Sequence, residues 1–268
     1  MSRISIVTVS FNAAHTLRDT LESVQRQLGA EVEHWLIDGA STDGTRDVVT
    51  RSGRHLAGFI SEPDKGLYDA MNKGAKRCSG DVLGFLNADD WYAGPDVLSA
   101  VALAFAQGAD LVYGNLDFVS PEPPHRVVRR WRDQPHTPHD LMRKGWVPAH
   151  PTTYIRTDLF HKLGGFDPKW SISADFAFLS SALMHPGVRL AFVPRTLVNM
   201  RVGGASTAGL GAIWRSNLQC ARALSELRAP HPWATILRKL AFKIPQMWAG
   251  PNPDGASLTP VPIWKPWE

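Results

Sequence analysis

The feature that most constrains this chain is a regular alternation of short apolar segments and helical segments over its first 115 residues. Residues 4–10 read ISIVTVS, an apolar and β-branched run typical of a strand covered on both faces. Asn12 follows as the expected N-cap of a helix, in which Leu17, Leu21, Val24 and Leu28 recur at helical spacing. Such an alternation predicts βαβ units and a mostly parallel sheet flanked by helices.

The same pattern continues along the chain. We predict further strands over residues 34–38, 57–61, 81–86, 110–113 and 189–193, and helices over 46–51, 67–78, 95–106, 157–163 and 174–184. In the less regular middle, residues 127–131 are expected to pair with residues 116–119, and a loop with a short helix should occupy 136–145. A helix from about 208 to 228 and a basic, apolar segment over 237–243 precede a Pro- and Trp-rich end.

Composition narrows the functional classes. The chain has 44% apolar and 20% charged residues, as expected for a folded globular protein, and only two cysteines, which excludes a disulfide framework. A net charge of +4 suits a phosphate-rich ligand, an anionic membrane surface or a nucleic acid, and does not choose among them. The first residues show no signal-peptide layout, and no apolar run approaches about 18 residues, so we expect a cytoplasmic location.

Polar clusters follow three of the predicted strands. These clusters are Ser10-Phe11-Asn12, residues 38–43, and Asn87-Ala88-Asp89-Asp90. Ligands of parallel sheets bind at the carboxyl ends of the strands, where these clusters should meet. Adjacent carboxylates repel each other unless a cation offsets them, and Mg²⁺ or Mn²⁺ bound by one or two carboxylates and substrate phosphates is the usual solution. The alternative for the third cluster is a polar turn that begins the next helix.

The first two clusters suit recognition of a nucleotide base. The Asp38 carboxylate can accept a hydrogen bond from a base N–H, and Phe11 can offer its ring face. Ordinary turn chemistry explains the Gly/Ser/Thr/Asp loop after Asp38 equally well, and Phe11 can be a core residue. The residues alone leave both alternatives open.

Longer strings carry a resemblance to a known family. VSFNAAHTL, IDGASTDGT and SEPDKGLYDAMNKGAKRCSGDVLGFLNADD, in this order and spacing over residues 4–115, resemble the family 2 glycosyltransferases with the GT-A fold. The stretch EPDKG-x-YDAMNKG is typical of the branch that builds bacterial surface polysaccharides, and HPTTYIR, GGFD and SADFAFL extend the likeness to about residue 205. The resemblance implies a Rossmann-like GT-A domain over 1–207, with a nucleotide-binding half (1–115) and an acceptor half (116–207), and a helical extension over 208–268.

The resemblance also implies roles for individual residues. It places Phe11 and Asp38 at the base, and Asp89 on the divalent metal, Mn²⁺ or Mg²⁺. Asn87 stands where the family more often has an aspartate, and its amide can still bind a ribose hydroxyl. The expected nucleotide-sugar contacts are Val9, Phe11, Asn12, Asp38, Lys65, Asn72, Asn87, Ala88, Asp90, His150 and Gly204.

Asp175 is the expected general base. Inverting transfer needs a carboxylate that takes the proton of the acceptor hydroxyl, and in the family this residue opens a helix after the sheet. Asp175 stands alone here, without the neighbouring glutamate that many members have, and a carboxylate that only favours a helix N-terminus is the alternative. His150 can be a ligand, a hydrogen-bond donor or a structural histidine. Gly203–Ser206 resembles a loop that closes over the sugar donor in the family, and an ordinary turn is the alternative.

We therefore expect an inverting enzyme that transfers a sugar from a nucleoside-diphosphate sugar, UDP favoured, to a hydroxyl of a glycan or polyprenyl-linked acceptor. The alternative is a catalytically degenerate nucleotide-sugar-binding or scaffold protein. A dinucleotide oxidoreductase would carry G-x-G-x-x-G where this chain has Ser10-Phe11-Asn12-Ala13-Ala14, and no nucleic-acid-binding module is recognisable. The C-terminal segment suggests peripheral contact with the inner face of the plasma membrane, with Trp214 and Trp233 either exposed or in the core.

Overall fold

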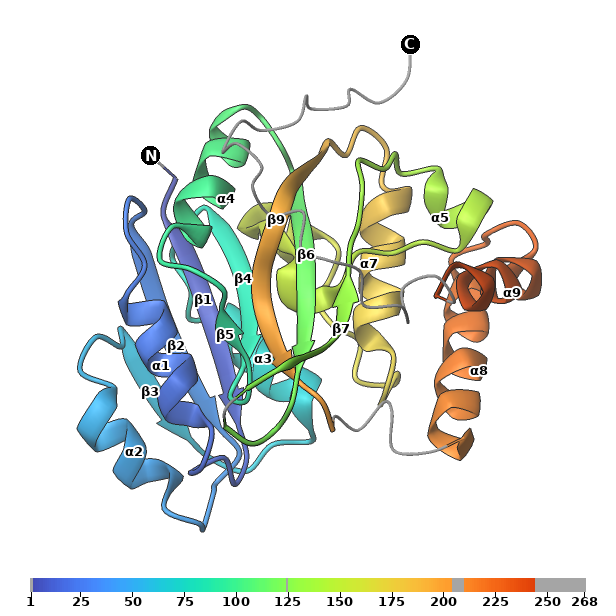
Figure 1. Cartoon of the computed structure of the whole chain (residues 1–268). Helices are drawn as coiled ribbons and strands as arrows, with labels where there is room; N and C mark the ends of the chain where they lie inside the picture. Colours follow the sequence, from blue (N-terminus) through green and yellow to red (C-terminus); the bar gives the residue numbers. More distant parts are fainter. Residues whose placement is uncertain (1, 124, 204–209, 244–268) are drawn as a thin grey trace.

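The computed structural model describes residues 2–123, 125–203 and 210–243. It is an α/β structure built on one nine-stranded sheet with the strand order β3-β2-β1-β4-β8-β6-β9-β5, in which β7 pairs with β6 outside this path (Figure 1). The strands are β1 (Ile4–Ser10), β2 (Val32–Asp38), β3 (Gly58–Ser61), β4 (Val82–Asn87), β5 (Trp91–Tyr92), β6 (Leu111–Val119), β7 (Val127–Trp131), β8 (Tyr154–Arg156) and β9 (Leu190–Arg201).

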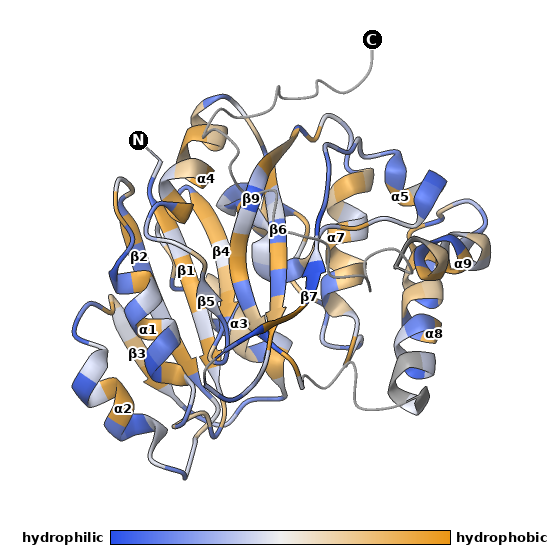
Figure 2. Cartoon of the chain, viewed as in Figure 1, coloured by the Kyte–Doolittle hydropathy of each residue, from blue (hydrophilic) through white to orange (hydrophobic). Residues whose placement is uncertain are grey.

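Helices cover both faces of this sheet. One apolar cluster joins residues of α3, α6, α7, α8 and α9 to one face, and two further clusters join α1, α2 and α4 to the other. The helices are α1 (Leu17–Gln25), α2 (Thr45–Ser52), α3 (Leu67–Ala75), α4 (Val97–Ala106), α5 (Asp140–Lys144), α6 (Thr157–Lys162), α7 (Ala174–Met184), α8 (Leu210–Glu226), α9 (Pro232–Lys243) and the short 3₁₀ helix η1 (His150–Thr152). All seven residues of β1 are buried, and β1 and β4 are mainly apolar in Figure 2, as a doubly covered strand requires.

The first four strands are parallel, as the sequence predicts. β1 lies between β2 and β4, and β3 adds to the outer edge of β2. The register aligns Ser10 with Asp38 and Asp38 with Ser61, while Val9 lies opposite Asn87. The carboxyl ends of all four strands therefore finish at one edge of the sheet, and the polar clusters of the sequence follow them there.

The second half of the sheet differs from the prediction in the length of two strands and in two short strands, β5 and β8, that were not predicted. The predicted strands over 110–113 and 116–119 form one continuous strand, β6, and the predicted strand over 189–193 continues to Arg201 as β9. β8, which the sequence analysis did not predict, lies antiparallel between β4 and β6. The predicted pairing of 127–131 with 116–119 is confirmed as the antiparallel pair β6–β7. β6 itself crosses the proposed division at residues 115 and 116, and the domain division stays a prediction.

The first helix departs from the prediction at both ends. It begins at Leu17 after the N-cap Thr16, so the prediction of Asn12 as the N-cap was wrong. Asn12 adopts a left-handed φ of 49°, and its Oδ1 accepts a hydrogen bond from the N–H of Thr42 at 3.0 Å. The side chain thus connects two loops at the sheet edge instead of capping a helix. The helix ends at Gln25, and Leu28 beyond it is 66% exposed.

The C-terminal helices belong to the main core. Cys220 and Leu224 of α8 and Ile236 of α9 are buried in the same apolar cluster as strands β1 and β6. Trp214 and Trp233 lie on the outside, 65% and 54% exposed, which decides the alternative that the sequence left open. Figure 1 shows α7, α8 and α9 following one another away from the sheet.

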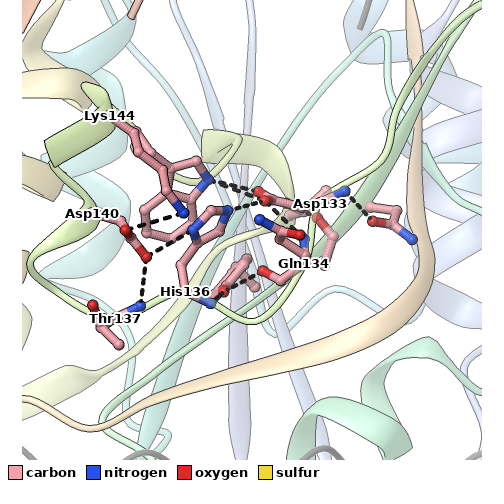
Figure 3. Close-up of polar contacts among 11 residues, drawn as sticks. Asp133, Gln134, His136, Thr137, Asp140 and Lys144 are labelled. Atoms are coloured by element: carbon pink, nitrogen blue, oxygen red, sulfur yellow. Dashed lines mark hydrogen bonds and ion pairs between the residues drawn. The ribbon is translucent and has the colours of Figure 1, made fainter. Parts of the chain in front are cut away.

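A polar cluster formed by the loop after β7, α5 and Trp146 holds α5 in place (Figure 3). The buried ring of His136 lies between two carboxylates, with Nε2 at 2.8 Å from Asp133 and Nδ1 at 3.0 Å from Asp140. The ring stacks on Trp146 at 4.1 Å between centroids, and Trp146 Nε1 donates to Asp133 at 2.9 Å. Lys144 reaches Asp140 at 3.2 Å from one turn further along α5. These contacts join the β7–α5 loop to α5.

Candidate active site

Asp38 lies at the end of β2 and is fully buried. The Ser10 hydroxyl donates to its Oδ1 at 2.9 Å, and the Ser61 hydroxyl and the Ser41 N–H donate to Oδ2 at 2.6 and 2.9 Å. The Ser41 hydroxyl also donates to Oδ1. Burial acts to raise the pKa of Asp38, but the hydrogen bonds from Ser41, Ser61 and Ser10 outweigh it and the pKa is lowered. Four donors occupy the carboxylate, so a base N–H reaches it only by displacing one of them.

Phe11 is the exposed aromatic residue at this edge. Its side chain is 68% exposed directly after β1, so it is not a core phenylalanine. A Cβ atom placed on Gly39 would lie 3.2 Å from the Phe11 ring and 2.6 Å from the carboxylate of Asp64. Phe11 and Asp64 therefore converge on one glycine, whose missing side chain lets an aromatic face and a carboxylate lie close together.

The Asn87-Ala88-Asp89-Asp90 segment contains buried oxygens with weak contacts only, since the Arg201 backbone and the Asn87 side chain act on Asp90. Within the described residues, the buried Asn87 Oδ1 and both carboxylate oxygens of Asp90 accept no hydrogen bond that meets ordinary geometry. Burial, and next the charge of Asp89, raises the pKa of Asp90 well above its ordinary value. Burial likewise raises the pKa of Asp89. Buried oxygens of this kind are costly unless a donor or a cation meets them.

These residues fit a hard divalent cation. Their donors are one amide and two carboxylate groups, the oxygen ligands that Mg²⁺ and Mn²⁺ take. The part of the chain that the structure describes has no group of three or more His, Cys, Asp or Glu side chains that could hold a metal by itself. A cation here would therefore need oxygens from a ligand to complete its coordination.

Arg201, which the sequence analysis did not single out, reaches this segment from the end of β9. Its Nη1 donates to the backbone carbonyl of Asp89 at 2.6 Å, and its Nη2 pairs with Asp19 of α1. The guanidinium stacks over Trp91 at 4.5 Å and is 6% exposed. It is a fixed positive charge beside Asp89 and Asp90, brought there from 112 positions away in the chain.

Lys65 and Asn72, the two residues expected to contact the donor from the EPDKG-x-YDAMNKG stretch, have different environments. Lys65 is exposed in the loop between β3 and α3, and its backbone N–H donates to Asp69 at 3.0 Å. The Asn72 amide is already engaged, since Nδ2 donates to the Phe166 carbonyl at 2.6 Å and Oδ1 accepts from the Phe166 N–H at 3.0 Å. Asn72 thus holds the Gly165–Phe166 turn against α3, which is a structural role for this side chain.

Asp175 lies in the first turn of α7, where the sequence predicted it. The Tyr68 hydroxyl of α3 donates to Asp175 Oδ1 at 3.0 Å. His150 lies nearby, since the charge of Asp175 acts on it; burial lowers the pKa of His150, and Asp175 acts in the opposite direction. The His150 ring stacks on Phe85 at 5.8 Å, and its buried Nε2 has no hydrogen-bond partner among the described residues. Burial therefore favours the neutral form of this histidine, whose ring contacts those of Phe85 and Phe166.

The remaining expected residues contribute backbone or lie outside the described chain. The side chains of Val9 and Ala88 are buried, and the Ala88 N–H donates to the Val9 carbonyl at 3.2 Å, which fixes the end of β4 on β1. Gly204 and most of the expected closing loop fall in residues 204–209, outside the described residues. The Trp residues of the tail after residue 243 are also outside them.

Two further site residues stood inside strings that the sequence analysis quoted. Asp64 and Tyr68 both belong to the EPDKGLYDAMNKG stretch, in which the resemblance implies roles only for Lys65 and Asn72. Their roles depend on contacts with Gly39 and Asp175, which are remote in sequence. The motif was the available signal for both residues, whereas nothing in the sequence pointed to Arg201.

The chain has a mostly parallel α/β sheet with polar residues at its carboxyl edge, an architecture typical of Rossmann-like nucleotide-binding enzymes. The model of the family described as "Glycosyl transferase family 2" matches residues 5–164, more than half of the chain. The chain belongs to this family and is a glycosyltransferase, which confirms the resemblance seen in the sequence.

Similar proteins agree with this assignment. A glycosyltransferase of Mycobacterium tuberculosis is 34% identical over 189 residues, which cover 68% of this chain and 69% of that protein. A PGL/p-HBAD biosynthesis glycosyltransferase of Mycobacterium bovis is 30% identical over 189 residues, 69% of this chain and 71% of its own length.

Solved structures share the fold. S. aureus TarS in complex with UDP superposes with a TM-score of 0.65 at 17% identity, covering 90% of this chain and 71% of that one. The mannosyltransferase PcManGT of Pyrobaculum calidifontis, in complex with GDP-Man and Mn²⁺, gives a TM-score of 0.60 at 18% identity, covering 91% and 70%. The fold is therefore GT-A, as predicted. Among the helices within the described residues, none is long and apolar enough to span a bilayer.

Proposed function

We propose that this glycosyltransferase moves a sugar from a nucleoside-diphosphate sugar, with UDP the favoured nucleotide, to a hydroxyl of a glycan or lipid-linked acceptor, with inversion at the anomeric carbon. The observation that carries the proposal is the alignment of four strand ends at one edge, where exposed Phe11 follows β1 and the buried oxygens of Asn87 and Asp90, which lack a well-aligned donor among the described residues, lie at the end of neighbouring β4. A nucleotide base needs an aromatic face, and a metal-bound diphosphate needs oxygen ligands for the metal close beside it.

The nucleotide would be held at the ends of β1, β2 and β3. The exposed ring of Phe11 suits stacking on a base, and the carboxylate of Asp64 near Gly39 suits a base N–H. Asp38, with four donors already on its carboxylate, would then shape the base pocket through Ser41 and Ser61. UDP bound to TarS, which has the same fold, supports uracil as the base.

Asp89 would hold a divalent cation, Mn²⁺ or Mg²⁺, together with Asp90 or Asn87. When bound, such an ion supplies positive charge against the diphosphate of the leaving group. Arg201 would add a fixed positive charge at the backbone of Asp89, and the buried oxygens beside it would gain the well-aligned partner that they lack among the described residues. The complex of PcManGT with Mn²⁺ supports a cation of this kind.

Asp175 would act as the general base in a single displacement. Its carboxylate takes the proton of the acceptor hydroxyl while the acceptor oxygen forms a bond to the anomeric carbon. The bond from that carbon to the diphosphate oxygen breaks at the same time, and its electron pair leaves with the nucleoside diphosphate. Attack from the face opposite the diphosphate inverts the anomeric centre.

The acceptor is expected to be a growing glycan or a lipid-linked precursor, and the biosynthetic role in the name of the M. bovis relative, PGL/p-HBAD biosynthesis, supports an assembly step of this kind. The exposed Trp214 and Trp233 lie on α8 and α9 among basic residues such as Arg215 and Arg222, and suit contact with an anionic membrane surface that carries a lipid-linked acceptor.

A thermal-shift screen tests donor binding. UDP-, GDP- and dTDP-sugars are added to the full chain, each with and without Mn²⁺ or Mg²⁺. We expect the UDP series to raise the melting temperature, and the metal to increase the shift, because a ligand that binds only the folded state stabilises it by mass action. A shift with GDP-sugars alone would contradict UDP, and a shift that ignores the metal would contradict the role of Asp89.

Turnover tests the catalytic base. Asp175→Asn should lower sugar transfer by at least about a hundredfold without changing the donor thermal shift, because the loss of a general base costs about 10²–10⁴ in rate. Asp158→Asn is the matched control, since Asp158 is an exposed carboxylate in the first turn of α6. Full turnover by Asp175→Asn would contradict the assignment. Donor binding without turnover in the unmodified chain would instead favour a degenerate nucleotide-sugar-binding protein.

A further inference from the structure

Tyr68 occupies a position that the family assignment does not explain. It is the second residue of α3, at the carboxyl edge of the sheet, and its side chain is buried. Its hydroxyl lies 3.0 Å from Oδ1 of Asp175 and 3.1 Å from the carbonyl oxygen of Ile172. Both partners belong to the start of α7 and the turn before it. Helix α3 thus contacts Asp175, the proposed general base, directly.

One hydroxyl proton serves two acceptors at this position. An ionised carboxylate accepts a hydrogen bond more strongly than a neutral group, so the proton of Tyr68 belongs on Asp175 while that residue is charged. After Asp175 has taken a proton, its Oδ1 is a weaker acceptor, and the carbonyl of Ile172 competes for the same hydroxyl. The hydrogen bond therefore favours the ionised form of Asp175 over the neutral form.

Tyr68 itself stays protonated. Burial, and next the charge of Asp175, raises the pKa of Tyr68 well above its ordinary value of 10.0. The hydroxyl can therefore donate to Asp175 but cannot replace it as the base. Among the described residues, only Tyr68 is recorded as a side-chain donor to the Asp175 carboxylate, and that contact is to Oδ1.

We propose that Tyr68 is the positioning residue of the catalytic carboxylate: it holds Oδ1 of Asp175, leaves Oδ2 to receive the acceptor proton and stabilises the charged form that must exist before transfer. This inference rests on the proposed function of Asp175 as the base. In the step, the acceptor proton moves to Oδ2 as the new glycosidic bond forms and the bond to the diphosphate breaks. Tyr68 neither gains nor loses a proton.

Other titratable groups surround this pair. His150 of η1 interacts with the charge of Asp175, and Cys220 of α8 interacts electrostatically with Tyr68. Lys239 of α9 lies 3.2 Å from the Cys220 sulfur and 4.4 Å from the ring of Phe176. These groups are the same in a Tyr68 variant, so a difference between variants reports the hydroxyl alone.

The test measures the titration of Asp175 without a substrate. The full chain is labelled with ¹³C at the aspartate Cγ, and the Asp175 resonance is assigned by its loss in Asp175→Asn. We expect Tyr68→Phe to move the midpoint of this titration upward by about one pH unit, the effect of removing one hydrogen bond to a charged group. The acid limb of the pH–rate profile for UDP-sugar hydrolysis should move in the same direction, with KM unchanged.

Tyr113→Phe is the matched control, because Tyr113 is a buried tyrosine whose hydroxyl donates to a backbone carbonyl, that of Gln134 at 2.9 Å. It should leave the Asp175 midpoint in place. Where Tyr68→Phe does not fold, 3-fluorotyrosine at position 68 keeps the hydroxyl as a stronger donor and should lower the midpoint. A folded Tyr68→Phe or a fluorotyrosine protein with an unchanged midpoint overturns the inference. Full turnover by Asp175→Asn overturns the proposed base instead, so the two failures are distinguishable.

Discussion

At the scale of single residues, buried polar groups carry the information that the sequence pattern does not. His34 of β2 is 1% exposed, with Nε2 at 2.9 Å from the Thr8 hydroxyl and Nδ1 at 3.0 Å from Nε2 of His55. Burial, and next the neighbouring His55, lowers the pKa of His34 from 6.5 to about 3. The native protein therefore holds this ring in its neutral form.

This residue predicts a dependence of stability on pH. The unfolded chain binds a proton at His34 below pH 6.5 and the folded chain does not, so the contribution to stability is complete above about pH 6.5 and is lost as the pH falls towards 3. Between pH 7 and pH 5 the loss should be about 2 kcal/mol. Urea unfolding of the full chain and of His34→Gln at both pH values checks this, since the variant should lose less stability. Equal losses of stability in both proteins would contradict the conclusion that buried His34 causes the pH dependence.

At the scale of secondary-structure elements, the close approach of α3 to the sheet decides the geometry of the site. α3 carries Tyr68 and Asn72, and it packs on β1 through Gly74. A Cβ atom at Gly74 would lie 2.3 Å from Cγ1 of Val7 and 3.1 Å from Cγ1 of Ile37. A larger residue would therefore push the helix, and with it Tyr68, away from the strands.

A pair of glycine substitutions tests this packing. Gly74→Ala should lower the free energy of unfolding by about 1–3 kcal/mol, because overpacking outweighs the gain in helix propensity. Gly211→Ala is the control in α8, where the glycine is exposed and the nearest atom to its Cβ would be 3.8 Å away. It should raise the free energy of unfolding by about 0.5–1 kcal/mol. Chemical denaturation gives both values, and the same sign for the two would contradict the packing argument.

At the scale of the whole molecule, the C-terminal helices and the sheet form one core. One apolar cluster contains Val7 and Val9 of β1, residues of α7, Leu224 of α8 and Ile236 of α9. The boundary proposed at residue 207 therefore separates residues that bury one another. The helices α8 and α9 should unfold together with the sheet.

Two adjacent residues of α9 test this integration. Ile236→Ala should cost about 2–4 kcal/mol, because the side chain is 3% exposed and its removal leaves a cavity. Leu237→Ala should change stability by less than about 0.5 kcal/mol, because that side chain is 67% exposed. Melting followed by far-ultraviolet circular dichroism and by tryptophan fluorescence should give one transition in each protein. A separate early transition in Ile236→Ala would mean that the extension unfolds by itself.

The sequence by itself determined the class of fold and the order of most elements, because strand and helix periodicities are local properties of the chain. It also placed Phe11 and Asp89 directly after strands whose carboxyl ends meet at one edge, since parallel βαβ units leave little other choice. The family assignment followed from strings of 9 to 30 residues in fixed order.

Only the tertiary structure decided what these side chains meet. Several contacts of the site join positions 3 to 112 residues apart. They are the donors on Asp38, the hydrogen bonds of Asn72 to Phe166, and the contacts of Tyr68 with Asp175 and of Arg201 with Asp89. The antiparallel β8 between β4 and β6, which the local pattern did not reveal, likewise depends on partners remote in sequence. Hydrogen bonding and burial at such positions depend on packing between distant segments, and no periodicity of the chain records that packing.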